Sequence, residues 1–473
     1  MDKERLNQII KEDLLLFINA CCTCTVQKEF YTNRYEQKMS LDFLHEYMLI
    51  NYRTYYMRIL AVNINQFNKT IIILNLLSNG KSTPPQLRFE ENRLITSALY
   101  KLPANRVYKL FQKIRQSGIN NRRTRAIVKN YLNNRKDLSF DIVKYRKKIN
   151  SAVAHNHIKL DGEANDFLFS GYKSGRFKTE LFESFRQAHF SKEAVYKLPY
   201  TVAEGFVKKH KINRSIFLDK IKSKMTLNEK LRSQELGNKK NIKIKIDLSK
   251  ASLTKIALYA LSLPYSRRKE RLDELDNALN KAAKRIISKW NLGLGKVAAV
   301  LDCSYSMSGS SEKKRRPLAI TLAGHYLLKN ASSEYKAFWT TDVKKSLLLQ
   351  AKGQSDLNTP FLDALEWKPE KIIILSDGYD NSFWRISDII RIFKTKIEKR
   401  KRTGVVHFNP VFDAHELEPR RISDLVPTIG LRDSEDIPSL LPFADLGEYK
   451  ESLSKLENFL NYCKERLMKQ VLI

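Results

Sequence analysis

The chain has 473 residues, which is enough for two or three domains with sizeable cores, and its 42% hydrophobic and 29% charged residues are typical of a soluble globular protein. No run of about 18 apolar residues is present to span a bilayer, and the first residues lack the basic-then-apolar order of a secretory signal. We therefore expect a cytoplasmic protein. Its five cysteines fit that compartment as buried thiols, because the C-x-C of Cys22 and Cys24 lacks a second pair of zinc ligands.

The formal net charge of +34 is unevenly distributed. Residues 1–295 hold 57 basic and 27 acidic side chains, whereas residues 296–473 hold 28 and 24. Solubility needs only a single-digit net charge, so the excess in the first part predicts a polyanionic partner whose phosphates release counterions on binding. A solvated basic surface and an anionic membrane surface are the alternatives. No amphipathic helix with exposed Trp or Phe and no lipidation motif supports the membrane.

Residues 1–235 show the pattern of short helices separated by polar turns. Apolar residues recur at intervals of three and four between Leu94 and Ile114, and Pro84-Pro85 and Pro103 mark turns. No strand pattern intervenes, so these residues predict an α-solenoid. After a loop at 236–241 and an alternation of isoleucine with lysine, helices are expected at Ser252–Leu261 and Arg271–Trp290.

The pattern changes at Gly293–Gly295. Uninterrupted apolar runs, which predict strands, alternate with helical segments from there on; the runs are Val297–Leu301, Lys336–Thr341, Lys371–Leu375 and Gly404–Phe408, and a helix is expected at Pro317–Leu328. This alternation predicts a parallel sheet covered on both faces, with an amphipathic last helix, Glu448–Lys469, packed on the sheet. We expect a helical region over residues 1–290 and an α/β domain over residues 291–473.

Oxygen-bearing side chains follow two of the predicted strands. Asp302, Ser304 and Ser306 form a D-x-S-x-S directly after the first strand, and Asp377 lies in the Ser-Asp-Gly that follows the strand at Lys371–Leu375. Between them, Ser355 precedes a helix. Ligands of open α/β sheets bind at the carboxyl ends of the strands. Hydroxyl and carboxylate oxygens there predict an octahedral site for Mg²⁺, completed by water.

These residues resemble the metal-ion-dependent adhesion site of von Willebrand factor A (vWA) domains. The resemblance implies that Asp302, Ser304, Ser306, Ser355 and Asp377 hold the cation, which is Mg²⁺ or a similar divalent ion. Ser355 stands where the family usually has Thr, and Thr359 is the alternative hydroxyl. The family leaves one coordination position for an acidic group of a partner. A vWA fold with a vestigial site is the other interpretation.

The preceding segment resembles the Ro ribonucleoprotein (TROVE) family. The resemblance rests on Leu198–Phe206, on Phe217–Ile221 with Lys224–Thr226, and on Leu279–Ile286 leading into the first strand. It implies a HEAT-like helical ring followed by a vWA domain. It also implies small noncoding RNA of the Y type as ligand, misfolded RNA 3′ ends in the ring, and a protein partner such as an exoribonuclease at the metal site. The first ~85 residues lack the Gly-rich, aromatic opening usual in that family.

Clustered basic residues mark where RNA would bind. The predicted RNA-binding residues are Arg122, Arg123, Arg125, Lys129, Lys144, Arg146, Lys147, Lys148, His157 and Lys159. Lysine and arginine contact phosphates, and His can stack on unpaired bases. The His-Ile-Lys at 157–159 resembles a His-Leu-Lys of the Ro RNA-binding surface. A further basic run at 239–245 is equally consistent with a solvated strand edge, and the run at 399–402 is expected to be only a solvated helix end.

No catalytic motif of the phosphate-loop, zinc-protease or nucleophile-elbow kind is present, and one Asp-x-Ser-x-Ser with a single further Asp is sparse for a two-metal nuclease. The sequence therefore predicts a non-enzymatic RNA-binding protein that engages neither DNA nor membrane and recruits a partner through Mg²⁺. The rival hypothesis is a vWA protein-protein adaptor whose basic helices bind an acidic protein or a membrane.

Overall fold

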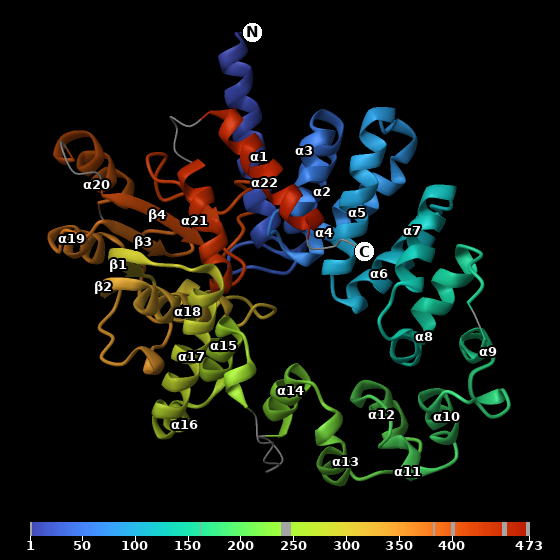
Figure 1. Ribbon diagram of the computed structural model, residues 1–473. Helices are drawn as coiled ribbons and strands as arrows, with labels where there is room; N and C mark the ends of the chain where they lie inside the picture. The colour runs from blue at the N-terminus through green and yellow to red at the C-terminus, as the bar shows by residue number, and fades with distance from the viewer. Residues whose placement is uncertain are drawn as a thin grey trace. The chain divides into compact units, whose positions relative to one another are not determined.

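The structure, a computed structural model, describes residues 2–160, 162–237, 247–381, 384–398, 403–446 and 452–469 (Figure 1). Tertiary contacts divide the chain into two compact units. Unit 1 comprises Met1–Asn68 and Asp247–Cys463, and unit 2 comprises Lys69–Ile246 and Lys464–Ile473. The boundary expected at residue 290 was inferred from the sequence pattern, whereas these units are defined by contacts. By contacts, the first 68 residues belong with the sheet.

Unit 1 contains a parallel sheet of five strands in the order β2-β1-β3-β4-β5. The strands are β1 (Leu294–Leu301), β2 (Ser332–Trp339), β3 (Lys371–Leu375), β4 (Gly404–Asn409) and β5 (Thr428–Gly430). Every pairing is parallel. The four predicted strands and the parallel sheet are confirmed. β5 was not predicted, because three residues are too few to show a periodic pattern.

Helices cover both faces of this sheet. On one face, Val300 and Ile374 pack with Phe361 of α19 (Asn358–Glu366) and Ile390 of α20 (Ile386–Ile392). On the other, Gly324 of α18 (Arg316–Ala331) lies so close to β3 that a Cβ there would come within 2.5 Å of Leu375. Three more helices precede β1 in the sequence: α15 (Leu253–Ser262), α16 (Tyr265–Glu270) and α17 (Leu272–Trp290). Burial on both faces is why Val297–Leu301 of β1 and residues 372–375 of β3 are continuously apolar.

The first helices complete unit 1. They are α1 (Lys3–Thr23), α2 (Arg34–Asn51) and α3 (Arg53–Arg58), with α4 (Gln66–Ser78) leading into unit 2. Asn19 of α1 donates to the carbonyl of Thr428 and accepts from the amide of Gly430, both at 3.0 Å. These two bonds satisfy polar groups of the outer strand β5 that would otherwise form an open sheet edge. The N-terminal region is therefore part of the α/β unit.

The last two helices of unit 1 pack against helices. Phe443 of α21 (Ile437–Leu446) lies 5.8 Å from Phe459 of α22 (Leu453–Lys469), measured between ring centroids, and Tyr55 of α3 donates to Glu457. Lys464 of α22 also pairs with Glu90 at 3.3 Å, so the contacts described for α22 are to other helices, where the sequence predicted packing on the sheet. The first residues expected in this helix, 448–451, lie outside the described part of the chain.

Unit 2 is built of short helices whose contacts are mostly between near neighbours in sequence. They are α5 (Arg88–Lys101), α6 (Ala104–Gln116), α7 (Arg122–Asn133), α8 (Leu138–His155), α9 (Glu163–Ser170), α10 (Glu180–Gln187), α11 (Lys192–Val195), α12 (Tyr200–Val207), α13 (Arg214–Ile221) and α14 (Leu227–Gly237). α5 packs against α7 and α6 against α8, and α8 also contacts α9, α10 and α12. The apolar repeat from Leu94 to Ile114 is buried in α5 and α6, as predicted.

Two of the basic runs noted in the sequence, 239–245 and 399–402, lie outside the described residues. Among the residues described, no helix combines the length and the apolar character needed to cross a bilayer.

Buried histidines predict a specific acid sensitivity. Burial lowers the pKa of His407 and of His45 to about 4. The unfolded chain takes up these protons below about 6.5, so the free energy of unfolding should decrease as pH falls from 6.5 toward 4, by up to roughly 1.4 kcal/mol per pH unit for each histidine. Urea unfolding across that range measures the slope. His407→Gln should give a shallower slope than the parent, and an identical slope in both proteins would contradict the assignment.

Candidate functional site

Asp302 is the centre of the candidate site. It follows β1, which lies between β2 and β3, so it occupies the point where the chain switches from one side of the sheet to the other. Its side chain is fully buried. One carboxylate oxygen accepts from the amide of Ser304 at 2.8 Å, and the other accepts from the hydroxyls of Ser376 at 2.9 Å and Ser355 at 3.3 Å. This carboxylate therefore joins the loops that follow β1 and β3 to the loop of Ser355.

Backbone bonds hold these loops together. The amide of Tyr305 donates to the carbonyl of Gly353, and the amide of Asn381 donates to the carbonyl of Ser355, both at 3.0 Å. The hydroxyls of Ser304 and Ser306 lie 3.2 Å apart. All five predicted metal-site residues are consequently gathered at one edge of the sheet. The alternative hydroxyl, that of Thr359, donates to Asp356 instead, at 2.9 Å.

Asp377 is the second buried carboxylate of the site. Its Oδ1 accepts from the amide of Tyr379 at 3.2 Å, and Asn409 of β4 donates to its backbone carbonyl at 2.9 Å. Burial, together with the negative charge of Asp302, raises the pKa of Asp377 to about 7. Burial also raises the pKa of Asp302. Two neighbouring acids without a compensating charge disfavour ionisation of each other.

The donor set fits a hard divalent cation. Every group described as hydrogen-bonding to the Asp302 carboxylate is neutral: the amide of Ser304 and the hydroxyls of Ser355, Ser376 and Thr340. A bound cation would supply the missing positive charge, and carboxylate and hydroxyl oxygens are suitable ligands for Mg²⁺. Within the described residues, no group of three or more His, Cys, Asp or Glu side chains is placed to hold a metal. A metal here would therefore depend on the serines.

Aromatic side chains from the N-terminal segment lie beside the site, which the sequence did not indicate. Tyr31 packs on Tyr379 with ring centroids 3.8 Å apart. Phe30 meets Tyr305 edge-on at 5.8 Å. The buried ion pair of Glu29 with Lys313 holds this segment in place. No local pattern could have shown it, because the partners are separated by more than 270 residues of sequence.

On α7, the predicted RNA-binding residues differ in how exposed they are and in whether they bond to other residues of the fold. Arg122, Arg125 and Lys129 are exposed. Arg123 is half-buried, pairs with Glu91 at 2.9 Å and donates to Asn92 at 2.6 Å. The exposed three thus remain available to phosphates, while Arg123 ties α7 to α5.

The same division holds on α8. Lys147 is exposed, whereas Lys144, Arg146 and Lys148 are half-buried. The Arg146 guanidinium lies over the rings of Phe167 at 5.5 Å and Phe185 at 6.0 Å, and donates to the carbonyl of Leu168 at 3.3 Å. Burial lowers its pKa. Arg146 therefore joins α8 to α9 and α10 from the inside of the unit.

His157 and Lys159 follow the end of α8 and are both exposed. His157 has φ +52°, and the amide of the next residue, Ile158, donates back to the carbonyl of Val153 at 3.0 Å. This is the left-handed turn that ends many helices. It directs the chain so that the imidazole of His157 stands in solvent beside the basic helices α7 and α8, which pack against each other.

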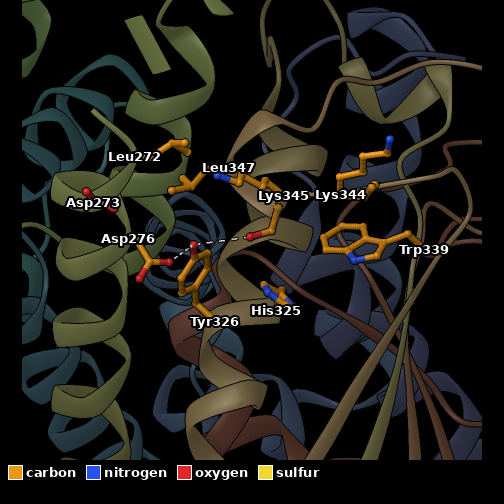
Figure 2. Close-up of a pocket in the computed structure, with 11 residues that line it drawn as sticks. Leu272, Asp273, Asp276, His325, Tyr326, Trp339, Lys344, Lys345 and Leu347 are labelled. Atoms are coloured by element: carbon orange, nitrogen blue, oxygen red, sulfur yellow. Dashed lines mark hydrogen bonds between the residues drawn. The ribbon is translucent and has the colours of Figure 1, made fainter. Parts of the chain in front are cut away.

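A separate cavity of about 400 Å³ opens in unit 1 between α17, α18 and the loop after β2 (Figure 2). Asp276 at its wall accepts from Tyr326 at 2.7 Å and from Asn280 at 2.8 Å, and His325 bonds Tyr335 at 2.8 Å. Burial lowers the pKa of His325 to about 4, so this imidazole is neutral. Asp276, His325 and Tyr326 thus already have partners within the fold.

Comparison with protein-family models gives no match, and comparison with curated proteins gives none either. Among solved structures, the chain is similar to the crystal structure of the Ro (RSR) protein of Deinococcus radiodurans, with a TM-score of 0.56 and 13% sequence identity over 93% of this chain and 99% of that one. This chain has a Ro fold. The resemblance inferred from sequence is confirmed for the fold, a helical region combined with a vWA-like α/β sheet, and at this identity it establishes the fold alone.

The candidate metal site predicts that Mg²⁺ stabilises the fold. Mg²⁺ at about 100 times its Kd should stabilise the protein by roughly 2.7 kcal/mol, which differential scanning calorimetry detects as a rise in Tm. Asp302→Ala should fold, because the sheet is held by apolar burial, but should lose this rise. Asp363→Ala, which removes an exposed aspartate of α19, is the matched control and should keep it. An undiminished rise in Asp302→Ala would place the metal elsewhere.

Two neighbouring basic residues of α8 should differ in their contribution to stability. Arg146→Ala removes a cation that packs on two rings and should lower the free energy of unfolding by about 1–2 kcal/mol. Lys147→Ala removes an exposed lysine and should stay within about 0.5 kcal/mol of the parent. Chemical unfolding of both variants measures the difference, and equal stabilities would show that Arg146 has no structural role.

Proposed function

We propose that this Ro-like chain is a non-enzymatic RNA-binding protein of the cytoplasm. Unit 2 would bind a small structured noncoding RNA of the Y type, or the 3′ ends of misfolded RNA. The metal site of unit 1 would recruit a protein partner that presents an acidic residue, such as an exoribonuclease. The proposal includes no DNA and no membrane ligand.

The distribution of charge over the two units carries this proposal. Unit 2 holds 42 basic and 15 acidic residues, a net charge of +27, whereas the larger unit 1 holds 43 and 36, a net charge of +7. Most of the excess, +27 of +34, therefore belongs to the helical unit. A fold does not need such an excess, and its self-repulsion is destabilising, so a polyanionic ligand of unit 2 is the simplest reason for it.

The exposed side chains of unit 2 suit RNA in particular. Arg122, Arg125, Lys129, Lys147 and Lys159 stand in solvent and can neutralise phosphates, and His157 beside them can contact a base. Phosphate contacts alone do not distinguish RNA from DNA. Discrimination would come from the 2′-hydroxyls and from the wide minor groove of A-form RNA.

The metal site supports the second part of the proposal. Asp302, Ser304, Ser306, Ser355 and Asp377 would hold Mg²⁺, and the cation would attract a carboxylate of the partner. The charge of unit 1 is too small to bind RNA strongly by counterion release. The two units would accordingly bind different ligands.

The adaptor hypothesis is the second candidate, since the same basic surface could meet an acidic protein. The two hypotheses differ in what accompanies the protein from the cell. Purification at low salt should yield protein with bound nucleic acid, seen as a raised ratio of absorbance at 260 to 280 nm, if the RNA-binding proposal is right. Sequencing that RNA would then identify the ligand.

The salt dependence of binding tests the proposal quantitatively. If about six phosphates are neutralised, the logarithm of the RNA affinity should fall against the logarithm of salt concentration with a slope of roughly −4 to −5. Arg122→Ala, Arg125→Ala and Lys129→Ala combined should weaken binding and make the slope less steep by about one unit per lost contact. Duplex DNA of equal length should compete poorly.

The control for this experiment is a triple variant of unit 1. Lys344→Ala, Lys345→Ala and Lys352→Ala remove three exposed lysines from the unit that is proposed not to bind RNA. Affinity and slope should match those of the parent protein. Equal losses in the two triple variants would mean that RNA affinity depends on total charge and not on unit 2.

A further inference from the structure

A stack of aromatic rings stands at the surface of unit 2, apart from the basic residues considered so far. Tyr172, in the short turn Gly171–Lys173 after α9, lies parallel to His189, with ring centroids 3.8 Å apart and planes inclined by 18°. Phe190 flanks both rings, with its centroid 6.5 Å from each. Tyr172 and Phe190 are exposed although they are large and apolar.

The stack rests on a rigid base. The edge of His189 meets Phe206 of α12 at 4.9 Å and Phe185 of α10 at 5.3 Å. Phe185 in turn lies beneath the guanidinium of Arg146. The backbone at Gly171 lies against this guanidinium, so that a Cβ there would lie 2.4 Å from it. Gly171 also has φ +60°, a value that favours glycine. Tyr172 and His189 are thus held in place before any ligand binds, which reduces the entropy lost on binding.

Basic residues surround the exposed rings. Lys209 lies 3.3 Å from Nδ1 of His189, measured from its Nζ, and the neighbouring Lys208 and Lys211 are exposed. Lys173 follows Tyr172 and is exposed as well. On α10, the negative charge of Glu183 is paired with Arg186. A flat apolar surface inside a positive field suits a ligand that is planar and carries phosphates.

We propose that Tyr172, His189 and Phe190 form a binding site for an unpaired base of RNA, with Lys208 and Lys209 contacting the phosphates beside it. This inference rests on the proposed function and adds the class of RNA element that unit 2 recognises. Bases in a duplex are stacked on each other and cannot reach the rings, whereas bases in a loop or at a 3′ end can.

The protonation state of His189 indicates that this residue would bind a base by ring stacking and not by attraction between charges. Burial and the nearby lysine and arginine charges lower its pKa to about 4, so the ring stacked on Tyr172 is neutral at physiological pH. Its Nε2 is buried and has no hydrogen-bond partner within the described structure. Recognition here depends on ring faces, and every base has such a face.

The test compares an RNA hairpin that has an unpaired loop with a blunt RNA duplex of the same length, by fluorescence anisotropy over a range of salt. Phe190→Ala should weaken hairpin binding about ten-fold, the usual order for one stacked base, and leave duplex binding unchanged. The salt slope should stay that of the parent, because no phosphate contact is lost. Lys208→Ala with Lys209→Ala should instead make the slope less steep for the hairpin by about one unit per contact.

Three variants sharpen the result. Phe190→Tyr keeps an aromatic face and should bind the hairpin like the parent. Phe190→Leu keeps apolar bulk but no ring and should lose affinity like Phe190→Ala. Phe89→Ala is the matched control, since Phe89 and Phe190 belong to unit 2 and are both 72% exposed. Its hairpin affinity should not change.

The outcomes separate this inference from the proposed function. If the parent protein binds neither RNA, the proposed function fails and the base site fails with it. If the parent binds both RNAs and Phe190→Leu or Phe190→Ala binds the hairpin equally well, the base site alone is refuted. Equal losses for hairpin and duplex would also overturn it, because they would show a contact that does not depend on unpaired bases.

Discussion

A buried carboxylate must have its hydrogen bonds satisfied, and at Asp302 this requirement organises the whole edge of the sheet. Its partners come from the loops after β1, β2 and β3 and from the loop of Ser355. These loops also bond one another through the backbone, and each brings one polar group to Asp302. The parallel pairing of β1 with β3 brings their carboxyl ends together, and the acid then determines where the hydroxyls stand. A geometry suited to a cation is therefore a consequence of satisfying one acid in the interior.

In unit 2 an arginine has a comparable role. Arg146 was expected at an RNA-binding surface because it lies in a run of basic residues, yet its guanidinium packs between rings of α9 and α10. A cation placed on aromatic faces can replace apolar contacts between short helices that have little surface of their own to bury. A few basic side chains of this unit thus pack inside it, while others, such as Lys147 and Lys159, are exposed.

The sequence was most informative where the pattern is local and periodic. The apolar run at Val297–Leu301 ending in Asp302 predicted a buried strand and the position of its acid, and both are as expected. The motif residues Ser304 and Ser306 follow from the same run. By contrast, β5 is too short to show a period, and the packing of Tyr31 on Tyr379 joins distant segments. The stack of Tyr172 on His189 was missed for a similar reason, since no spacing of residues in a sequence shows which rings lie parallel.

The two hydrogen bonds from Asn19 to β5 span 409 and 411 residues, and the pair of Glu29 with Lys313 spans 284. During synthesis α1 leaves the ribosome 409 residues before the strand that receives it. Phe17 can pack early on His45 and Tyr56, but the side chain of Asn19 has no strand to bond until β5 is made. Unit 2 has mostly local contacts and can fold while translation continues, so unit 1 completes its fold after most of unit 2.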